Sequence, residues 1–290
     1  MPNAQTLGRV SSTTNREGRF MEKEISFRSL DGQMLVGTLT LPVRKNRGAV
    51  LLVHGLTVDR HEAGFYDLFA ARLAANGYAS LRFDLRAHGK SSGDFQTFSL
   101  SAVLGDIQAA VRALQTRTNL PKCHLVGTSF SGGLTIWASS LIEPKVGRIV
   151  LFNPLLNYRK RFLEEKTWFD GLALTSAGVR ELSKNGYLKH LSFKLSIPFI
   201  NELMTYRITK LPKPKIPVLT IHGTQDSMVP YSIAKRHSRY NAASTFLSIG
   251  GADHGFYEPS DEDGSDPVTR ANWSFVFDKA VEWFRKADRR

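Results

Sequence analysis

Hydrophobic and polar positions divide the first part of the chain into stretches of different periodicity. Residues 25–28 alternate between apolar and polar side chains, and residues 34–41 do the same after the turn at Asp31-Gly32. Alternation on both sides of a short glycine turn is typical of two antiparallel strands that bury one face. We therefore expect an antiparallel hairpin at one edge of a sheet.

The next stretches combine apolar runs with a helical repeat. Residues 49–53 form a continuous apolar run, and we interpret residues 79–85 as a second strand that is buried on both faces. Between them, apolar side chains recur at helical spacing over residues 65–73. A strand, a helix and a strand in this order predict parallel pairing with a right-handed crossover.

The alternation of strands and helices continues through most of the remaining chain. We expect, in chain order, a helix at 100–114, a strand at 124–126, a helix at 130–141, and strands at 148–152 and 218–222, followed by a helix at 232–237, a strand at 245–249 and a helix at 273–284. This order predicts a doubly wound α/β core. Residues 153–211 carry many aromatic side chains without a regular succession of elements, so we interpret them as a cap inserted into that core.

The expected organisation has three parts. Residues 1–22 are polar and contain no apolar segment, which predicts a disordered arm rather than a secretory signal, with Met21 as an alternative start. Residues 23–152 and 212–290 form the core, and residues 153–211 form the cap. A chain of 290 residues is long enough to bury a sizeable core.

Composition and charge narrow the class of protein. The chain has 39 Lys and Arg against 26 Asp and Glu, a formal net charge of +13. The basic residues are scattered and belong to no groove-reading motif, so we expect no nucleic-acid partner. No apolar run in the sequence is long enough for a transmembrane segment. Cys123 is the only cysteine, which excludes an intramolecular disulfide and favours a cytoplasmic location.

Three short segments combine glycines with a serine, an aspartate or a histidine. They are Gly127-Thr128-Ser129-Phe130-Ser131-Gly132-Gly133, His222-Gly223-Thr224-Gln225-Asp226 and Gly251-Ala252-Asp253-His254-Gly255. In chain order they supply a serine, an acid and a histidine. This is the order of the α/β-hydrolase layout, and it differs from the orders found in other serine hydrolase folds. The chain is therefore predicted to be an enzyme.

Ser129 is the expected nucleophile. The apolar run before it ends at Val126, so a sharp turn between strand and helix should follow at once and project the serine side chain into a site. Strand and helix approach closely at such a turn, and Gly127 and Ser131 are small enough to stand two residues before and after Ser129. Ser131 is the alternative nucleophile, with Gly133 behind it, but the end of the strand favours Ser129.

His254 is the expected general base, because it follows the last predicted strand, in a glycine-bounded loop at the carboxyl edge of the sheet, where ligand-facing loops gather. Asp226 is the expected acid, since it follows the strand at 218–222 after a short turn and could hold one tautomer of the imidazole. Asp253 is an alternative acid, but the side chains of consecutive residues usually diverge. Asp84 is expected to cap its own loop.

Two backbone N–H groups are expected to stabilise the oxyanion that forms during acyl transfer. The N–H of Phe130 lies at the start of the helix behind the nucleophile, where the helix dipole also favours negative charge. The N–H of Leu56, just after His54-Gly55, is the second expected donor.

With these residues placed, the sequence resembles the α/β-hydrolase superfamily from about Lys23 to the final helix. Within the superfamily it looks most like bacterial esterases of the cinnamoyl and feruloyl type. The resemblance rests on five segments in the right order, residues 54–55, 84–91, 127–131, 222–226 and 251–254. It implies an α/β-hydrolase fold, a mostly parallel twisted sheet with helices on both faces and an inserted cap over the active site. It also implies hydrolysis of carboxylic esters with no cofactor and no metal.

The expected reaction is cleavage of a small-molecule carboxylic ester through an acyl-enzyme intermediate. The alternative is a thioester hydrolase or acyltransferase acting on acyl-ACP or acyl-CoA, with an acidic carrier protein as partner, because Ser131 resembles the variant turn of some such enzymes. Two alternatives of a different class stay open. One is a catalytically silent α/β-hydrolase fold that only binds a ligand, which the complete triad disfavours, and the other is a nucleic-acid binder with a basic surface. The oligomeric state is left open by the sequence.

Overall fold

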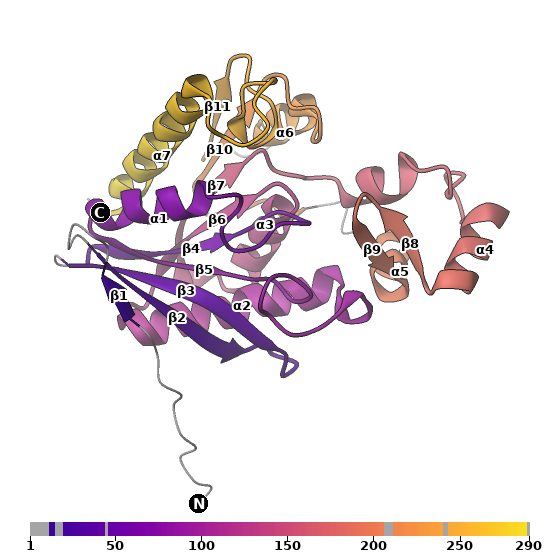
Figure 1. The fold of residues 1–290 in the computed structure, drawn as a ribbon, viewed down its shortest axis with the longest axis horizontal. Coiled ribbons are helices and arrows are strands. Elements are labelled where there is room, and N and C mark those ends of the chain that lie inside the picture. The colour runs from indigo at the N-terminus through magenta and orange to yellow at the C-terminus, as the bar shows by residue number, and fades with distance from the viewer. Residues whose placement is uncertain (1–11, 15–19, 44–45, 206–210, 240–242, 289–290) are drawn as a thin grey trace, which may run out of the picture.

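The centre of the molecule is a mixed, mostly parallel sheet (Figure 1). The computed structural model describes residues 12–14, 20–43, 46–205, 211–239 and 243–288. Within these ranges the sheet has nine strands in the order β1-β2-β3-β5-β4-β6-β7-β10-β11. Their bounds are β1 (Ser12–Thr14), β2 (Phe20–Arg28), β3 (Met34–Pro42), β4 (Gly48–Val53), β5 (Tyr78–Phe83), β6 (Cys123–Thr128), β7 (Val146–Phe152), β10 (Val218–Gly223) and β11 (Ser244–Ile249).

The pairing confirms the two kinds of strand expected from the sequence. The predicted hairpin is formed by β2 and β3, which pair antiparallel, and β3 continues antiparallel onto β5. From β5 to β11 every pair is parallel. Because the carboxyl ends of parallel strands share one edge of a sheet, the loops after β4, β6, β10 and β11 lie at the same edge. These are the loops that carry the expected site residues.

Helices cover both faces of the sheet, as Figure 1 shows. Their bounds are α1 (Phe65–Ala75), α2 (Leu100–Thr118), α3 (Ser131–Leu141), α6 (Tyr231–Ser238) and α7 (Pro267–Asp288). Short 3-10 turns connect them at η1 (Phe95–Thr97), η2 (Glu143–Lys145) and η4 (His254–Phe256). None of the helices in the described ranges is both long and apolar enough to cross a membrane.

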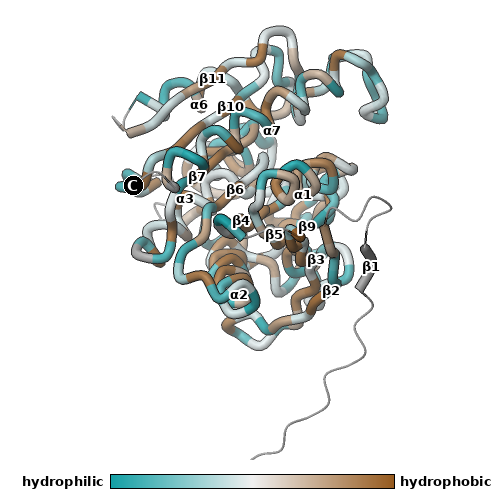
Figure 2. The backbone as a smooth tube through the Cα atoms, turned by 90° about the vertical axis from the view of Figure 1, so that its left-hand side faces the viewer, coloured by the Kyte–Doolittle hydropathy of each residue, from teal (hydrophilic) through white to brown (hydrophobic). Residues whose placement is uncertain are grey.

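Alternate side chains of the parallel strands contribute to two apolar clusters, one on each face of the sheet. In β4, Val50 and Leu52 join the apolar cluster that contains residues of α1 and α7, whereas Leu51 and Val53 join the cluster that contains residues of α2 and α3. Successive side chains of a strand point to opposite faces, so a strand covered on both faces must be apolar throughout. Figure 2 shows the hydrophobic stretches gathered in the interior, on the central strands and the sheet-facing helices.

A segment between β7 and β10 occupies the place of the expected cap. It contains the π-helical turn η3 (Lys160–Glu164), α4 (Ser176–Asn185), the two-stranded sheet of β8 (Tyr187–His190) and β9 (Phe193–Ser196), and α5 (Ile197–Thr205). Figure 1 shows α4, α5, β8 and β9 together at one end of the molecule. Buried side chains of this segment, including Leu195, Phe199 and Leu203, belong to the same apolar cluster as α2 and α3. The segment therefore shares the core rather than forming one of its own.

The prediction that residues 1–22 form a disordered arm is wrong for residues 12–14 and 20–22. Residues 12–14 form β1 and pair with residues 21–23 of β2, which itself begins at Phe20. The remaining residues of the arm lie outside the described ranges. An edge strand needs few apolar side chains because most of its surface faces water, so a polar stretch can still be a strand.

Several predicted boundaries also move. The strand predicted to end at 85 ends at Phe83, and the Asp84 side chain that follows accepts hydrogen bonds from the backbone and the side chain of Arg60. The last helix is longer than the predicted 273–284 and runs from Pro267 to Asp288. The apolar repeat marks the part of that helix that packs on the sheet, whereas the added turns carry exposed residues such as Arg270 and Arg285.

Candidate active site

Ser129 lies in a strained turn between β6 and α3. Its backbone φ is +50°, a left-handed conformation that L residues rarely adopt. The turn requires close packing, because a Cβ added to Gly127 would stand 2.3 Å from Thr135 Oγ1 and 2.9 Å from the Ser131 carbonyl oxygen. The structure therefore gives Gly127 the crowded position that the sequence reasoning assigned to it.

Ser131, the alternative nucleophile, faces a different environment. Its side chain is fully buried, and its hydroxyl donates a hydrogen bond to the backbone oxygen of His54. This bond ties the start of α3 to the end of β4. The structure brings Ser129, and not Ser131, to the histidine loop.

Three side chains predicted from distant segments converge at the carboxyl edge of the sheet. His254 Nε2 lies 3.0 Å from Ser129 Oγ, and His254 Nδ1 lies 2.9 Å from Asp226 Oδ2 and 3.1 Å from Asp226 Oδ1. The carboxylate fixes the proton of His254 on Nδ1, which leaves the Nε2 lone pair for the serine hydroxyl. The arrangement allows Nε2 to take the hydroxyl proton.

Asp226 is shielded from water yet held as a carboxylate. Its side chain has no exposed surface, and it accepts hydrogen bonds from the backbone N–H groups of Met228 at 3.0 Å and Val229 at 2.7 Å. Burial opposes its ionised form, but hydrogen bonds from His222 and His254 and the charge of His254 outweigh burial. Together they lower the pKa of Asp226 well below its usual range.

His222 is a partner of Asp226 that the sequence reasoning missed. It was set aside because it ends a strand before a glycine, but its Nε2 lies 3.0 Å from Asp226 Oδ2, and neither side chain is exposed. The spacing of four residues in His222-Gly223-Thr224-Gln225-Asp226 is the one sequence signal that could have indicated this pair. The second imidazole satisfies an oxygen of the buried carboxylate, as a buried charge requires.

The alternative acid, Asp253, turns away from the imidazole of His254. Asp253 Oδ1 accepts the backbone N–H of Ser227 at 2.7 Å and that of His254 at 2.6 Å, while its Oδ2 accepts the Ser227 hydroxyl at 3.1 Å. Asp253 thereby joins the loops after β10 and β11. Asp84, expected to cap its own loop, accepts the backbone N–H of Lys90 at 2.8 Å and also binds Arg60.

The two expected oxyanion donors lie in turns next to Ser129. Within the part of the chain that the structure describes, neither the Leu56 nor the Phe130 backbone N–H donates a hydrogen bond to another protein group. Gly55, which precedes Leu56, borders the serine, since a Cβ at that position would stand 3.7 Å from Ser129 Oγ. Both N–H groups are therefore free to bind an oxygen of a substrate.

His54 controls the peptide that carries the Leu56 N–H. Burial, together with the charge of His88, lowers the pKa of His54 to about 3, so the ring is neutral. Its Nε2 accepts the Leu85 N–H at 2.9 Å, which leaves the proton on Nδ1 to bind the Gly55 carbonyl oxygen at 2.7 Å. A trans peptide places its C=O and N–H on opposite sides, so this bond fixes the direction of the Leu56 N–H.

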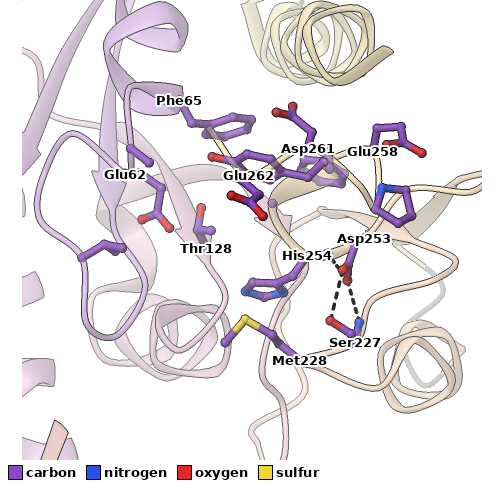
Figure 3. Close-up of a pocket in the computed structure, with 16 residues that line it drawn as sticks. Glu62, Phe65, Thr128, Ser227, Met228, Asp253, His254, Glu258, Asp261 and Glu262 are labelled. Atoms are coloured by element: carbon purple, nitrogen blue, oxygen red, sulfur yellow. Dashed lines mark hydrogen bonds between the residues drawn. The ribbon is translucent and has the colours of Figure 1, made fainter. Parts of the chain in front are cut away.

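A cavity of about 320 Å³ lies beside His254 (Figure 3). Loops after β4, β10 and β11 line it, together with Thr128 at the end of β6. Five of its lining residues are acidic, none is Lys or Arg, and several are aromatic. The lining residues are Val58, Glu62, Ala63, Phe65, Thr128, Ser227, Met228, Asp253, His254, Gly255, Phe256, Tyr257, Glu258, Pro259, Asp261 and Glu262.

The segment between β7 and β10 packs directly on Phe130, the residue after Ser129. The ring of Phe130 is buried, and its centroid lies 5.6 Å from that of Tyr158, 6.0 Å from that of Phe162 and 6.4 Å from that of Phe199. These ring contacts pack the segment between β7 and β10 against the start of α3. In the described ranges no group of three or more His, Cys, Asp or Glu side chains is placed to hold a metal ion.

Comparison with known families places this geometry in context. A family model described as serine aminopeptidase, S33, matches residues 44–196. A curated relative, the AB hydrolase superfamily protein YisY of Bacillus subtilis (strain 168), is 23% identical in an alignment of 241 residues, and the match covers 73% of this chain and 87% of the relative.

Solved structures share the fold over nearly the whole chain. Est1E from Butyrivibrio proteoclasticus, determined with ferulic acid bound, superposes with a TM-score of 0.70 at 22% identity and covers 89% of this chain and 99% of its own. The esterase Pf2001 of Pyrococcus furiosus has a TM-score of 0.63 at 18% identity and covers 96% of this chain and 97% of its own. At these identities the likeness establishes the α/β-hydrolase fold.

Proposed function

The chain belongs to the serine aminopeptidase S33 family of α/β-hydrolases, and we propose that it cleaves carboxylic esters through an acyl-enzyme formed on Ser129. The observation that carries this proposal is the hydrogen-bonded line from Ser129 Oγ to His254 Nε2 and from His254 Nδ1 to Asp226. A serine hydroxyl is a poor nucleophile unless a base is in reach of its proton. The 3.0 Å contact between Ser129 Oγ and His254 Nε2 meets that requirement.

Acylation begins when Ser129 Oγ attacks the ester carbonyl carbon. The hydroxyl proton moves to His254 Nε2 as the new C–O bond forms, and Asp226 stabilises the resulting imidazolium. The carbonyl oxygen becomes an oxyanion, which accepts hydrogen bonds from the Leu56 and Phe130 N–H groups. His254 then donates its proton to the leaving alcohol oxygen as the ester C–O bond breaks.

Deacylation repeats these steps with water in place of the serine hydroxyl. His254 Nε2 takes a proton from water as the water oxygen attacks the acyl carbonyl carbon. The bond between the acyl group and Ser129 Oγ breaks, and the proton on His254 returns to Ser129. The products are a carboxylic acid and an alcohol, and the enzyme is restored.

For the acyl group, we propose an apolar or aromatic one. Two observations support this. The cavity beside His254 is lined in part by Phe65, Phe256 and Tyr257, and Est1E, which has this fold, was determined with ferulic acid bound. Aromatic walls favour apolar ligands because they remove apolar surface from water.

The first experiment tests the nucleophile by labelling with a fluorophosphonate probe. We expect the native protein to be labelled and Ser129→Ala to be unlabelled and inactive. Ser131→Ala is the matched control, since it removes a hydroxyl two residues away that bonds His54 and not His254. Labelling that survives Ser129→Ala and disappears in Ser131→Ala would transfer the nucleophile to Ser131.

The second experiment tests the substrate class with a panel of acyl donors. p-Nitrophenyl esters of increasing acyl length and hydroxycinnamate esters are compared with acyl-CoA, acyl-ACP and aminoacyl p-nitroanilides. We expect kcat/KM to be highest for esters. Preferential turnover of thioesters, or of the aminoacyl p-nitroanilides that an aminopeptidase would cleave, would contradict the proposed ester substrate.

A further inference from the structure

Glu62 is an acidic residue of the site that lies outside the proposed triad. It sits in the loop between β4 and α1, and its side chain lines the cavity beside His254 (Figure 3). Glu62 Oε2 accepts the backbone N–H of Gly55 at 2.7 Å. Gly55 immediately precedes Leu56, the proposed oxyanion donor, so Glu62 binds the same short turn on which the reaction depends.

Gly55 lies in the narrow space between Glu62 and Ser129. A Cβ built at Gly55 would stand 3.2 Å from Glu62 Oε1 and 3.2 Å from Ser129 Cβ. A side chain at residue 55 would therefore contact both groups at once. Because residue 55 has no Cβ, the Glu62 carboxyl group and Ser129 can both approach it closely.

Glu62 and His54 bind different atoms of the same glycine. Glu62 accepts the Gly55 N–H, while His54 Nδ1 donates to the Gly55 carbonyl oxygen at 2.7 Å. The first bond fixes the peptide before Gly55 and the second fixes the peptide after it, which contains the Leu56 N–H. Rotation about the two backbone torsions of Gly55 is thereby restricted at both ends. A glycine at this position would otherwise be conformationally free.

The loop that presents Glu62 has an unusual backbone. Glu62 and Ala63 have φ values of +49° and +53°, and Gly64 follows with +88°. Left-handed conformations at two L residues persist only where the surroundings determine them. Arg60 supplies such an anchor, because its backbone N–H and Nη1 bind Asp84 at 2.8 and 2.6 Å.

We propose that Glu62 is a positioning residue, whose carboxyl oxygen holds the Gly55 N–H and thereby aims the Leu56 N–H at the oxyanion. This inference rests on the proposed function, since an oxyanion forms only in acyl transfer. Glu62 acts through the backbone of Gly55, and the bond requires only a lone pair on one oxygen. Both a carboxylate and a neutral carboxyl group offer that lone pair.

The charges around Glu62 are consistent with a role that does not require ionisation. Burial raises the pKa of Glu62 to about 7, and nearby Asp59 adds to this, while the Gly55 N–H and the charge of His254 oppose it. A carboxyl group that is partly neutral near pH 7 places less negative charge beside a developing oxyanion. A permanently ionised neighbour would repel it.

Two substitutions of Glu62 test separately whether the hydrogen bond to the Gly55 N–H or the negative charge of the side chain is needed. Glu62→Gln keeps an acceptor oxygen at the same distance and removes the charge, whereas Glu62→Asp keeps the charge and withdraws the carboxylate by one methylene. We expect Glu62→Gln to retain kcat within about threefold. We expect Glu62→Asp to lower kcat by about 10- to 100-fold with KM little changed, below the 10²- to 10³-fold loss seen when an oxyanion donor is removed outright.

Binding of a trifluoromethyl ketone provides a readout of the oxyanion itself. Its tetrahedral adduct with Ser129 carries the oxyanion, so its affinity should fall in Glu62→Asp in parallel with kcat/KM and be kept in Glu62→Gln. Glu282→Gln, an exposed carboxylate on α7 that pairs with Lys279, is the control for an unrelated loss of charge.

Each outcome decides the proposal. If Glu62→Gln loses as much kcat as Glu62→Asp, an acceptor oxygen alone is not sufficient and the charge is also needed. If Glu62→Asp keeps full activity, the bond to Gly55 is dispensable. Either result overturns it. If the native protein is labelled by a fluorophosphonate but cleaves no ester, the proposed substrate class fails while the labelling rates of the two variants still test Glu62.

Discussion

His222 Nε2 lies 3.0 Å from Asp226 Oδ2, and neither of the two side chains is exposed to water. Asp226 therefore stands between two imidazoles, since His254 Nδ1 binds the same oxygen at 2.9 Å. Only His254 reaches the nucleophile. His222 donates to the carboxylate, and its Nε2 also lies 3.1 Å from the Val229 carbonyl oxygen. His222 belongs to β10, the strand that precedes Asp226, so the carboxylate of the proposed triad is positioned by its own strand as well as by the loop that carries His254.

Replacing His222 with Phe should weaken both stability and activity. The substitution keeps a ring of similar size but removes a donor from a buried carboxylate, a loss worth about 1–3 kcal/mol. Without that donor the pKa of Asp226 should rise from its lowered value. A depressed acid stabilises the folded state above its unfolded pKa and loses that contribution as the pH falls, so acid unfolding should begin at a higher pH in His222→Phe than in the native protein. Urea unfolding between pH 3 and 7 measures this, and identical acid limbs would contradict it.

Replacing Asp226 with Asn should abolish most activity without unfolding the protein. The N–H of an amide at 226 can donate a hydrogen bond to His254 Nδ1, which favours the tautomer with the imidazole proton on Nε2 and removes the lone pair that Ser129 needs. The equivalent change in a serine protease triad lowers kcat by about 10⁴-fold. The measurement is kcat on the best ester of the panel.

Asp253→Asn is the matched control for this change. Asp253 binds Ser227 and the backbone N–H of His254, not the imidazole, so its loss should shift the loop and reduce kcat far less. A larger loss in Asp253→Asn than in Asp226→Asn would restore Asp253 as the acid.

Replacing Gly127 with Ala should destabilise the turn that holds Ser129. The added Cβ would stand 2.3 Å from Thr135 Oγ1 and 2.9 Å from the Ser131 carbonyl oxygen, and backbone cannot move aside as a flexible side chain can. Overpacking of this kind costs about 1–3 kcal/mol and sometimes more. Gly250→Ala is the control, since a Cβ there meets nothing within 4 Å. Equal denaturation midpoints for the two variants would show that the turn is not crowded.

Glu62 should make stability fall as the pH rises from about 4.5 to about 7. Its pKa is raised in the folded state, so over this interval the folded protein binds more protons than the unfolded chain. Stability therefore decreases with pH across the interval. Glu62→Gln has no proton to lose there, and the difference in unfolding free energy between it and the native protein should change in favour of the variant between pH 5 and pH 8. A constant difference would indicate an ordinary pKa for Glu62.

Local patterns identify the elements that build the site. The apolar run at residues 49–53 predicts β4, and the hairpin is predicted by alternation around Asp31-Gly32. The choice of Ser129 over Ser131 follows from where the strand ends and from Gly127. These features depend on the backbone period and on turn chemistry, which neighbouring residues in the chain determine.

The hydrogen bonds between distant segments and the structure of the inserted segment could not be predicted from such local patterns. Glu62 carries no motif, and its bond to Gly55 depends on a left-handed backbone at residues that the sequence does not mark. The interior of the cap, with its π-helical turn and small second sheet, likewise has no simple period.

The sequence by itself determined an α/β fold and the identity of the three side chains proposed to react. Only the tertiary structure decided that Ser129 and His254, 125 residues apart, come within 3.0 Å, that His222 supports Asp226, and that Glu62 binds Gly55. The physical reason is that periodicity and turn residues act over a few positions, whereas a hydrogen bond between distant segments depends on strand order and on how loops pack at one edge of the sheet.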